Sequence, residues 1–259
     1  MQEQINSPAL TLGILGGLGP ASSVFFCDML TEHTYAEKDQ DHLNFILSSR
    51  ASTPDRTAFI LGRSEENPAP FMIREVERLI SAGADIIAIP CNTAHYFYES
   101  VQNATGAPII NIIHQTVDFC RFTGAEKIGV LATEGTIASG AYKTVIEAAG
   151  MEYLTCTEYE QQIISSIIYD QIKKGLVPDL SEFWKIARRL TDQNGCDKLI
   201  LGCTELSLLK KNAALDDRFV DSLEVLAYSA IKLCGKAPKD FSESLQKFVP
   251  RKDSAYVTQ

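Results

Sequence analysis

The sequence repeats one short pattern, and this repeat restricts the possible folds more than any other feature. The segments GADIIAIPCNTAH, residues 83–95, and GCDKLILGCTEL, residues 195–206, each run from a glycine through an apolar stretch to a cysteine. The two cysteines, Cys91 and Cys203, are 112 residues apart, as are the glycines and aspartates that precede them. The pattern predicts two copies of one structural unit in a single chain.

Further landmarks and the expected elements follow the same order in both halves. Gly13 and Gly129 are 116 residues apart, and Asn111 and Asp221 are 110 apart. Short apolar runs predict strands at 10–17, 43–49, 85–91 and 107–113, then at 127–133, 151–156, 197–203 and 218–223. Helical spacing of apolar residues predicts helices at 22–35, 71–83, 92–105, 139–150, 161–175, 180–195 and 204–212.

Strands that alternate with helices indicate parallel sheets built from β-α-β units. We therefore expect an α/β protein with two similar doubly wound parallel-sheet domains, related by pseudo-two-fold symmetry, and an active site in the cleft between them. The first domain is predicted to comprise residues 1–113 and 222–259, and the second residues 114–221. Residues 225–248 should form a helix that returns to the first domain, and the polar tail 249–259 should be frayed.

Composition excludes several classes of function. The formal charge of −9 argues against a nucleic-acid partner, because phosphate backbones require a basic surface. No apolar run approaches the roughly 20 residues that a membrane helix needs, so no membrane partner is expected. The N-terminal sequence lacks the basic start and apolar stretch of a signal peptide, which predicts a cytoplasmic protein.

The seven cysteines predict neither disulfides nor a metal site. Their number is odd, the chain is long enough to fold on an apolar core, and no C-x-x-C pair is present. Most should be reduced, and five have no setting that suggests chemistry and are expected in cores: Cys27, Cys120, Cys156, Cys196 and Cys234.

Cys91 and Cys203 have a different setting, because each stands between the end of a strand and the start of a helix. Ligands of open parallel sheets bind beyond these strand ends, and a helix start lowers the pKa of a thiol and attracts carboxylates. Two thiols on opposite walls of one cleft suit inversion at carbon: one removes a proton and the other returns a proton to the opposite face. Either cysteine alone is as well explained as a small core residue, but the matched pair favours function.

The residues that follow the two cysteines suit a carboxylate ligand. Asn92, Thr93 and Thr204 can offer side-chain and backbone donors to it.

Five motifs carry a family resemblance over most of the chain: GILGGLGP, PDRT, IPCNTAH, IYDQIKKG and LGCTEL. Together they resemble the aspartate/glutamate racemase family, in particular its aspartate racemase and broad-specificity amino-acid racemase branch. The resemblance implies a pyridoxal-independent racemase with no cofactor, two similar α/β domains and the two cysteines as its acid–base pair. It also implies a homodimer, since dimers are common in the family.

The same motifs separate this chain from glutamate racemases, which typically carry Asp-Ser-Gly at the first loop and Cys-Thr-His in the second motif. Here the first loop reads Leu15-Gly16-Gly17 and the second motif Cys203-Thr204-Glu205. Some broad-specificity relatives replace one cysteine by threonine. This chain keeps both, which favours racemisation in both directions.

The resemblance further implies two cations for substrate carboxylates, Arg56 in PDRT and Lys173 in IYDQIKKG. Arg56 suits this role because its planar fork can bond both oxygens of a carboxylate, although it is alternatively a surface residue after a turn. Lys173 alternatively complements the dipole of a helix that ends at Gly175. The glycine-rich turn at Gly16 can let the backbone approach a substrate.

Three further residues have open roles. Relatives usually have Asn-x-Pro before Pro-Asp-Arg, whereas this chain has Ser49-Arg50-Ala51, so Arg50 is either a third cation or a solvent-facing residue. Glu205 suits the start of the second helix whether or not it takes part in the chemistry. His95 lies one turn after Cys91, where a packed or capping role is favoured over tuning of the thiol.

These observations predict cofactor-independent racemisation of a small dicarboxylic amino acid, aspartate or glutamate, in which Cys91 and Cys203 exchange the roles of base and acid. Three alternatives stay open: a two-cysteine maleate isomerase, a hydantoin racemase, and a non-catalytic amino-acid sensor.

Overall fold

The first half of the chain forms a four-stranded parallel sheet. The computed structural model describes residues 9–210 and 215–252. The strands lie in the order β2-β1-β3-β4, and β1 is buried along its whole length, as expected for a strand covered by helices on both faces. Their bounds are β1 (Leu12–Gly16), β2 (Phe45–Ser49), β3 (Ile86–Ala88) and β4 (Ile109–Ile110).

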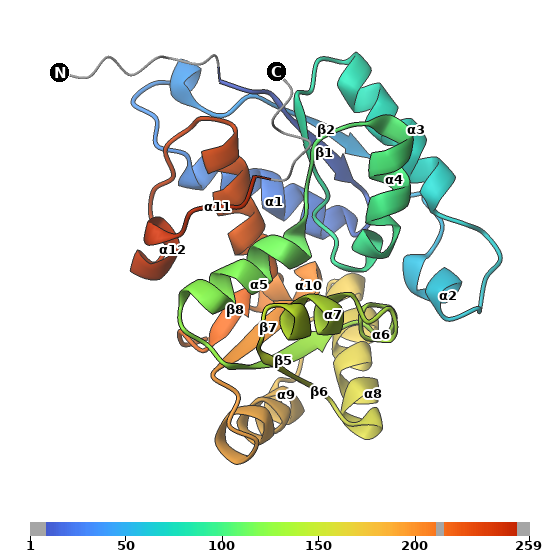
Figure 1. The fold of residues 1–259 in the computed structure, drawn as a ribbon. Coiled ribbons are helices and arrows are strands. Elements are labelled where there is room, and N and C mark those ends of the chain that lie inside the picture. The colour runs from blue at the N-terminus through green and yellow to red at the C-terminus, as the bar shows by residue number, and fades with distance from the viewer. Residues whose placement is uncertain (1–8, 211–214, 253–259) are drawn as a thin grey trace.

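The second half repeats this arrangement. Its sheet has the order β6-β5-β7-β8, again with parallel neighbours. The bounds are β5 (Lys127–Ala132), β6 (Glu152–Thr155), β7 (Lys198–Gly202) and β8 (Phe219–Asp221). Figure 1 shows the first sheet in the upper part of the molecule and the second below it. The predicted α/β class with two similar parallel sheets is confirmed.

Helices cover both sheets. The α-helices of the first half are α1 (Pro20–His33), α2 (Arg56–Ile60), α3 (Ala69–Ser81), α4 (Tyr98–Thr105) and α5 (Ile112–Phe122), with 3-10 turns at Asp39–Asp41 and Thr93–Phe97. Those that follow are α6 (Glu134–Ala138), α7 (Ala141–Ala148), α8 (Glu158–Ser166), α9 (Ser181–Arg188), α10 (Thr204–Lys210), α11 (Ser222–Leu233) and α12 (Glu243–Lys247). Helix α8 continues as a π-helical turn at Ile167–Gln171 and a 3-10 turn at Ile172–Lys174, and α9 continues as a π-helical turn at Arg189–Gln193.

Helix α11 contacts both halves: α1 and α5 of the first, and α10, β7 and β8 of the second. Its sequence is apolar on nearly all sides, which suits a helix enclosed by its neighbours. The chain then runs beside the first half: the Tyr35 N–H donates to the Ala237 carbonyl at 2.8 Å, and the Lys236 ammonium donates to the Asp41 carbonyl at 2.7 Å. The main core therefore joins residues of both sheets through α1, α5 and α11.

Several strands are shorter than expected, among them Ile86–Ala88 within the predicted 85–91, and at two of them the prediction was wrong because a helix begins inside the predicted strand. Residues 107–113 and 218–223 form strands only over Ile109–Ile110 and Phe219–Asp221. The cause is local: the Asn111 and Asp221 side chains accept hydrogen bonds from backbone N–H groups two residues later and start α5 and α11.

The expected C-terminal helix at 225–248 is also two helices, α11 and α12, separated by a non-helical stretch. Residues 211–212 of the helix expected at 204–212 and residues 253–259 of the expected tail lie outside the described residues.

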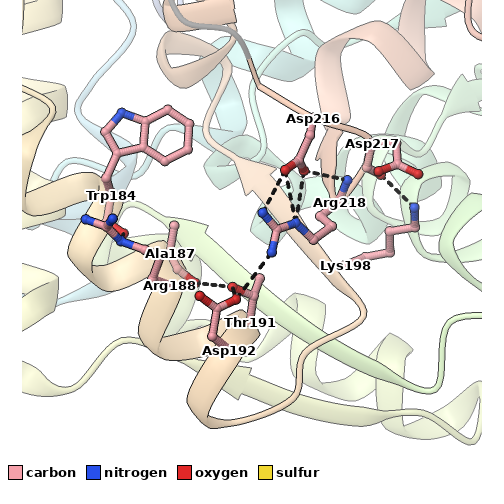
Figure 2. A network of polar contacts seen from close by, with 9 residues as sticks. All are labelled: Trp184, Ala187, Arg188, Thr191, Asp192, Lys198, Asp216, Asp217 and Arg218. Carbon is pink, nitrogen blue, oxygen red and sulfur yellow. Dashed lines mark hydrogen bonds and ion pairs between the residues drawn. The ribbon is translucent and has the colours of Figure 1, made fainter.

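A surface network holds the segment that leads into β8 (Figure 2). Arg218 pairs with Asp216 at 2.7 Å and with Asp192 at 3.3 Å, and the Lys198 ammonium donates to the Asp217 carbonyl at 2.6 Å. These groups are exposed, so each pair contributes little stability, about 0–1 kcal/mol. Together they hold residues 216–218, the segment that leads into β8 at the edge of the second sheet.

Within the described part of the chain, no helix has the length and apolar character needed to cross a membrane.

Candidate active site

The two repeated cysteines line one small cavity beyond the carboxyl ends of both sheets. Cys91 follows β3 and Cys203 directly follows β7. The cavity volume is about 20 Å³, room for one or two water molecules. Its lining residues are Leu18, Asp55, Arg56, Thr57, Cys91, Asn92, Thr93, Thr133, Tyr169, Lys173, Cys203, Thr204 and Glu205.

The structure thus brings together eight of the ten candidate residues, and two lie elsewhere. Arg50 points to α3, where it pairs with Glu75 at 2.5 Å. Gly16 packs against Leu47 and Ser23, which a side chain at this position would strike. Neither appears among the residues that line the cavity.

Cys203 is held as a neutral thiol by its surroundings. Its S–H donates to Glu205 Oε2 at 3.0 Å. Burial, followed by the negative charge of Glu205, raises the pKa of Cys203 well above its ordinary value, and the nearby Lys173 offsets only part of this. The sulfur at this corner therefore carries its proton at neutral pH.

Lys173 and Glu205 form an ion pair next to this thiol. The Lys173 ammonium donates to Glu205 Oε1 at 2.5 Å, so the two carboxylate oxygens have different partners. Burial acts to lower the pKa of Lys173, but the negative charge and the hydrogen bond of Glu205 outweigh it and raise that pKa. Gly19 makes room for this carboxylate, because a Cβ at position 19 would collide with Glu205 Oε1.

His95 has a structural role at the other corner. Its Nδ1 lies 2.9 Å from the Cys91 carbonyl, and its Nε2 accepts the Ile112 N–H at 3.2 Å. These partners fit a neutral ring with the proton on Nδ1, and burial lowers the pKa of His95 to about 4. His95 therefore ties the turn that carries Cys91 to the start of α5, in agreement with the packed or capping role.

Three hydroxyls form a closed triangle on the Cys91 side. Thr93 Oγ1 lies 2.9 Å from Thr133 Oγ1 and 2.8 Å from Thr136 Oγ1, and the last two are 2.9 Å apart. Thr133 and Thr136 belong to the second half, where Thr133 caps α6. The triangle thus joins the loop after β3 to the loop after β5.

The Asn92 side chain also bridges the halves. Its amide donates to Ser222 Oγ at 3.0 Å, and its carbonyl oxygen accepts from the Tyr142 hydroxyl at 2.7 Å. Both bonds are buried. Although Asn92 lines the cavity, the hydrogen bonds of its carboxamide go to Tyr142 of α7 and Ser222 of α11.

Arg56 is the first residue of α2 and is fixed by main-chain carbonyls. Its guanidinium donates to Leu18 at 2.6 Å, Pro54 at 3.0 Å and Thr53 at 3.3 Å. Its Nε is buried and has no hydrogen-bond partner. An unpaired buried donor beside a cavity is suited to an acceptor on a ligand.

Sequence reasoning missed several lining residues, of which Thr57 and Tyr169 are the most informative. Their hydroxyl oxygens lie 2.9 Å apart, and both also line a neighbouring outer pocket of about 430 Å³. Both residues of this contact therefore belong to the pocket and to the cavity. Two signals were available: Tyr169 precedes Lys173 by one helical turn, and Thr57 and Tyr169 are 112 residues apart, like the cysteines.

The five cysteines that were assigned to cores lie outside the cavity. All seven are free thiols. Cys120, Cys196 and Cys234 are buried, whereas Cys27 and Cys156 are half-buried against the cores.

Comparison with known proteins identifies the family. The family model described as Asp/Glu/Hydantoin racemase matches residues 15–230. A broad specificity amino-acid racemase of Bacillus subtilis, RacX, is 29% identical over 224 residues, which are 85% of this chain and 96% of that protein. A glutamate racemase of Aquifex pyrophilus is 30% identical over 194 residues, 72% of each chain.

Among solved structures, the aspartate racemase of Picrophilus torridus is similar, with a TM-score of 0.75 and 28% identity over 92% of this chain and 100% of that one. The resemblance seen in the motifs is confirmed: the chain belongs to the Asp/Glu/Hydantoin racemase family.

Proposed function

We propose that this protein is a cofactor-independent racemase that inverts the α-carbon of aspartate or glutamate by proton transfer between Cys91 and Cys203. The observation that carries the proposal is that the two cysteines of the repeated pattern line the same small cavity. Family membership supports the type of reaction. The similarity to an aspartate racemase supports the class of substrate.

The reaction needs one thiolate and one thiol. The thiolate removes the α-hydrogen as a proton, and the electron pair left on the α-carbon is delocalised into the neighbouring carboxylate. The second cysteine gives its thiol proton to the opposite face of the carbon. The product is the other enantiomer, and the proton has moved from one sulfur to the other, so the reverse reaction can follow.

The contacts of Cys203 support an assignment of roles in the resting protein. Its S–H donates to Glu205, and its raised pKa keeps it protonated, so Cys203 is the acid and Cys91 the first base. For the opposite enantiomer Cys203 must first lose its proton. Glu205 is the carboxylate in direct contact with that proton and is the proposed acceptor.

The charges around the cavity support a carboxylate substrate. Arg56 and Lys173 are the cations, Asp55 and Glu205 the anions. The Asp55 carboxylate accepts the Ala58 N–H at 2.6 Å, so it is already occupied. A substrate carboxylate competes with Glu205 for Lys173 and can accept from the free Nε of Arg56.

The division into domains of residues 1–113 with 222–259 and of residues 114–221, the homodimer and the cytoplasmic location stay predictions. Sedimentation of the full chain over a range of concentrations tests the dimer.

The decisive experiment incubates the full-length protein with L-aspartate in D₂O without added cofactor and follows deuterium at the α-carbon and formation of D-aspartate. Both should appear, and a Cys27→Ser variant, which alters a half-buried thiol outside the cavity, should behave like the unmodified protein. Absence of exchange with aspartate and glutamate enantiomers contradicts the proposal. Conversion of maleate to fumarate selects the isomerase, racemisation of a 5-substituted hydantoin selects the hydantoin racemase, and binding without exchange selects the sensor.

A further inference from the structure

Arg50 begins the loop that carries Arg56 to the cavity, and hydrogen bonds connect the two residues. The Arg50 carbonyl accepts from the Thr53 N–H at 3.2 Å and from the Thr53 hydroxyl at 2.9 Å. The Thr53 carbonyl in turn accepts from Arg56 at 3.3 Å. The position of Arg56 therefore depends on where the main chain at Arg50 is held.

The Arg50 side chain is anchored to a buried carboxylate on α3. Its guanidinium donates to Glu75 Oε1 at 2.5 Å and lies 5.4 Å from the Phe71 ring centroid. Glu75 is nearly inaccessible, and its other oxygen accepts from Ser48 at 2.7 Å. Burial acts to raise the pKa of Glu75, but the bonds from Arg50 and Ser48 outweigh it and hold that pKa below its ordinary value. The anchor is a charged pair at the end of β2.

The loop after β1 interlocks with the same main chain. The Arg50 N–H donates to the Gly16 carbonyl at 3.3 Å. Gly17 has a φ of 82°, and a Cβ there would lie 2.5 Å from the Arg50 nitrogen, so only glycine allows this approach. The next residue, Leu18, provides the carbonyl that receives Arg56 at 2.6 Å. Two of the carbonyls that accept from the Arg56 guanidinium, those of Thr53 and Leu18, thus belong to segments that contact the Arg50 main chain.

We propose that Arg50 and Glu75 are positioning residues for Arg56, and that their ion pair fixes the loop 50–55 so that the Arg56 guanidinium stays at the cavity. The kinetic consequence of this inference rests on the proposed function, in which Arg56 binds a substrate carboxylate. Its structural consequence, an ordered loop, is independent of the reaction.

Arg78 offers a matched control. It also donates to Glu75 Oε1, at 2.7 Å, but from one turn later on α3 itself, and its side chain is 67% exposed. Removing Arg78 takes a cation from the same carboxylate without releasing the loop. Any effect that Arg50→Ala has and Arg78→Ala lacks is due to the connection between α3 and the loop.

The first test is amide hydrogen exchange on the full-length protein. Arg50→Ala should speed exchange in the peptide 50–58 by about tenfold, the loss of one charged anchor, and Arg78→Ala should leave it unchanged. Arg50→Lys keeps a cation near Glu75 and should restore most of the protection. Equal exchange in Arg50→Ala and the unmodified protein, or an equal increase in Arg78→Ala, overturns the inference. Glu75→Gln should match Arg50→Ala, and thermal unfolding of each variant identifies any that fails to fold.

The second test separates positioning from general stability through kinetics. Arg50→Ala should raise KM for L-aspartate about tenfold with kcat within about twofold, because Arg56 is displaced while the cysteines are untouched. In an Arg56→Lys background the same change should raise KM less than about twofold, since the residue it acts on is already altered. Equal factors in both backgrounds overturn the positioning role. A protein that shows the loop effect but does not racemise aspartate contradicts the proposed function alone.

Discussion

The corners at Cys91 and Cys203 occupy matching places in the two sheets, yet they surround their thiols with opposite chemistry. Position by position at the 112-residue offset, Thr93 corresponds to Glu205. Thr93 joins a triangle of neutral hydroxyls, whereas Glu205 forms an ion pair with Lys173 and accepts a hydrogen bond from the Cys203 thiol. The repeated fold places the two sulfurs at matching corners, and at one corner the charge of Glu205 adds to the effect of burial in raising the pKa of Cys203.

The corners at Cys91 and Cys203 also form different hydrogen bonds to the helix after the next strand, which is α5 in the first half and α11 in the second. His95 accepts the Ile112 N–H at the start of α5, while Ser207, 112 residues later, donates to the Asp221 carboxylate that caps α11 at 2.6 Å. The two halves thus reach the same backbone geometry with different polar groups. The side chains at these positions are free to differ because each needs only to satisfy the local donors and acceptors.

The strongest test of the comparison removes each sulfur in turn. Cys91→Ser and Cys203→Ser should each lower the rate of racemisation by at least about a thousandfold. At neutral pH the hydroxyl of serine is a far weaker acid than a thiol and a far weaker base than a thiolate. The rate of optical inversion from each enantiomer of aspartate measures this. Cys27→Ser should retain the full rate, and full activity of either cavity variant would remove that cysteine from the mechanism.

Glu205→Gln tests the ionised corner alone. Since the Glu205 charge raises the pKa of Cys203, its removal should lower that pKa, and the midpoint of Cys203 alkylation by iodoacetamide should move to lower pH. Racemisation in the direction that uses Cys203 as base should fall about 10- to 100-fold, because glutamine cannot take up the proton that Cys203 must lose, and this outweighs the gain from the lower pKa of Cys203. Peptide mass spectrometry follows the alkylation. An unchanged midpoint would disprove the coupling, and Thr93→Val, at the matching position, is the control.

Thr136→Val tests the neutral corner. It removes two hydrogen bonds of the triangle but leaves the one between Thr93 and Thr133. The free energy of unfolding should fall by about 1–2 kcal/mol, measured by urea denaturation. Thr144→Val, an equivalent change at an exposed helical position, should be close to neutral. Equal stability of the two variants would show that the two hydrogen bonds of Thr136 contribute nothing to stability.

Tyr169→Phe should have the smallest effect. Burial raises the pKa of Tyr169 to about 12, so its hydroxyl stays protonated and its bond to Thr57 persists at neutral pH. Losing this one bond should let small reagents reach the cavity faster, by about fivefold at most. The rate of Cys203 alkylation measures this, and Thr57→Ser, which keeps a hydroxyl, should not change it. An unchanged or slower rate in Tyr169→Phe would contradict the idea that the bond between Thr57 and Tyr169 restricts access to the cavity.

The two strand-to-helix corners could be predicted from the sequence because each depends on a local order of residues: an apolar run, a cysteine and a helix start. It therefore predicted the two parallel sheets and placed Cys91 and Cys203 at matching strand ends. The strand ends at Asn111 and Asp221 were missed, because a capping side chain there outweighs the apolar residues that follow.

The rest of the site depends on contacts between distant segments. Thr133 reaches the cavity only because the loop after β5 meets the loop after β3, and no spacing in the sequence marks that meeting. The direction of Arg50 likewise depends on Glu75 of α3, whose burial follows from packing rather than from its own polarity. Tyr169 could have been predicted, since it lies 112 residues after Thr57, the same separation as between the two cysteines.

The hydrogen bond between Thr57 and Tyr169 joins two positions separated by the repeat offset itself. In an isologous dimer, the residue nearest the two-fold axis faces its own copy. Here the two facing positions belong to one chain, so they are free to carry different residues, as they do. A true dimer of identical halves would be limited to one residue type at this point. Covalent linkage of the halves is thus what allows matching positions of the two halves to carry chemically different residues around one cavity.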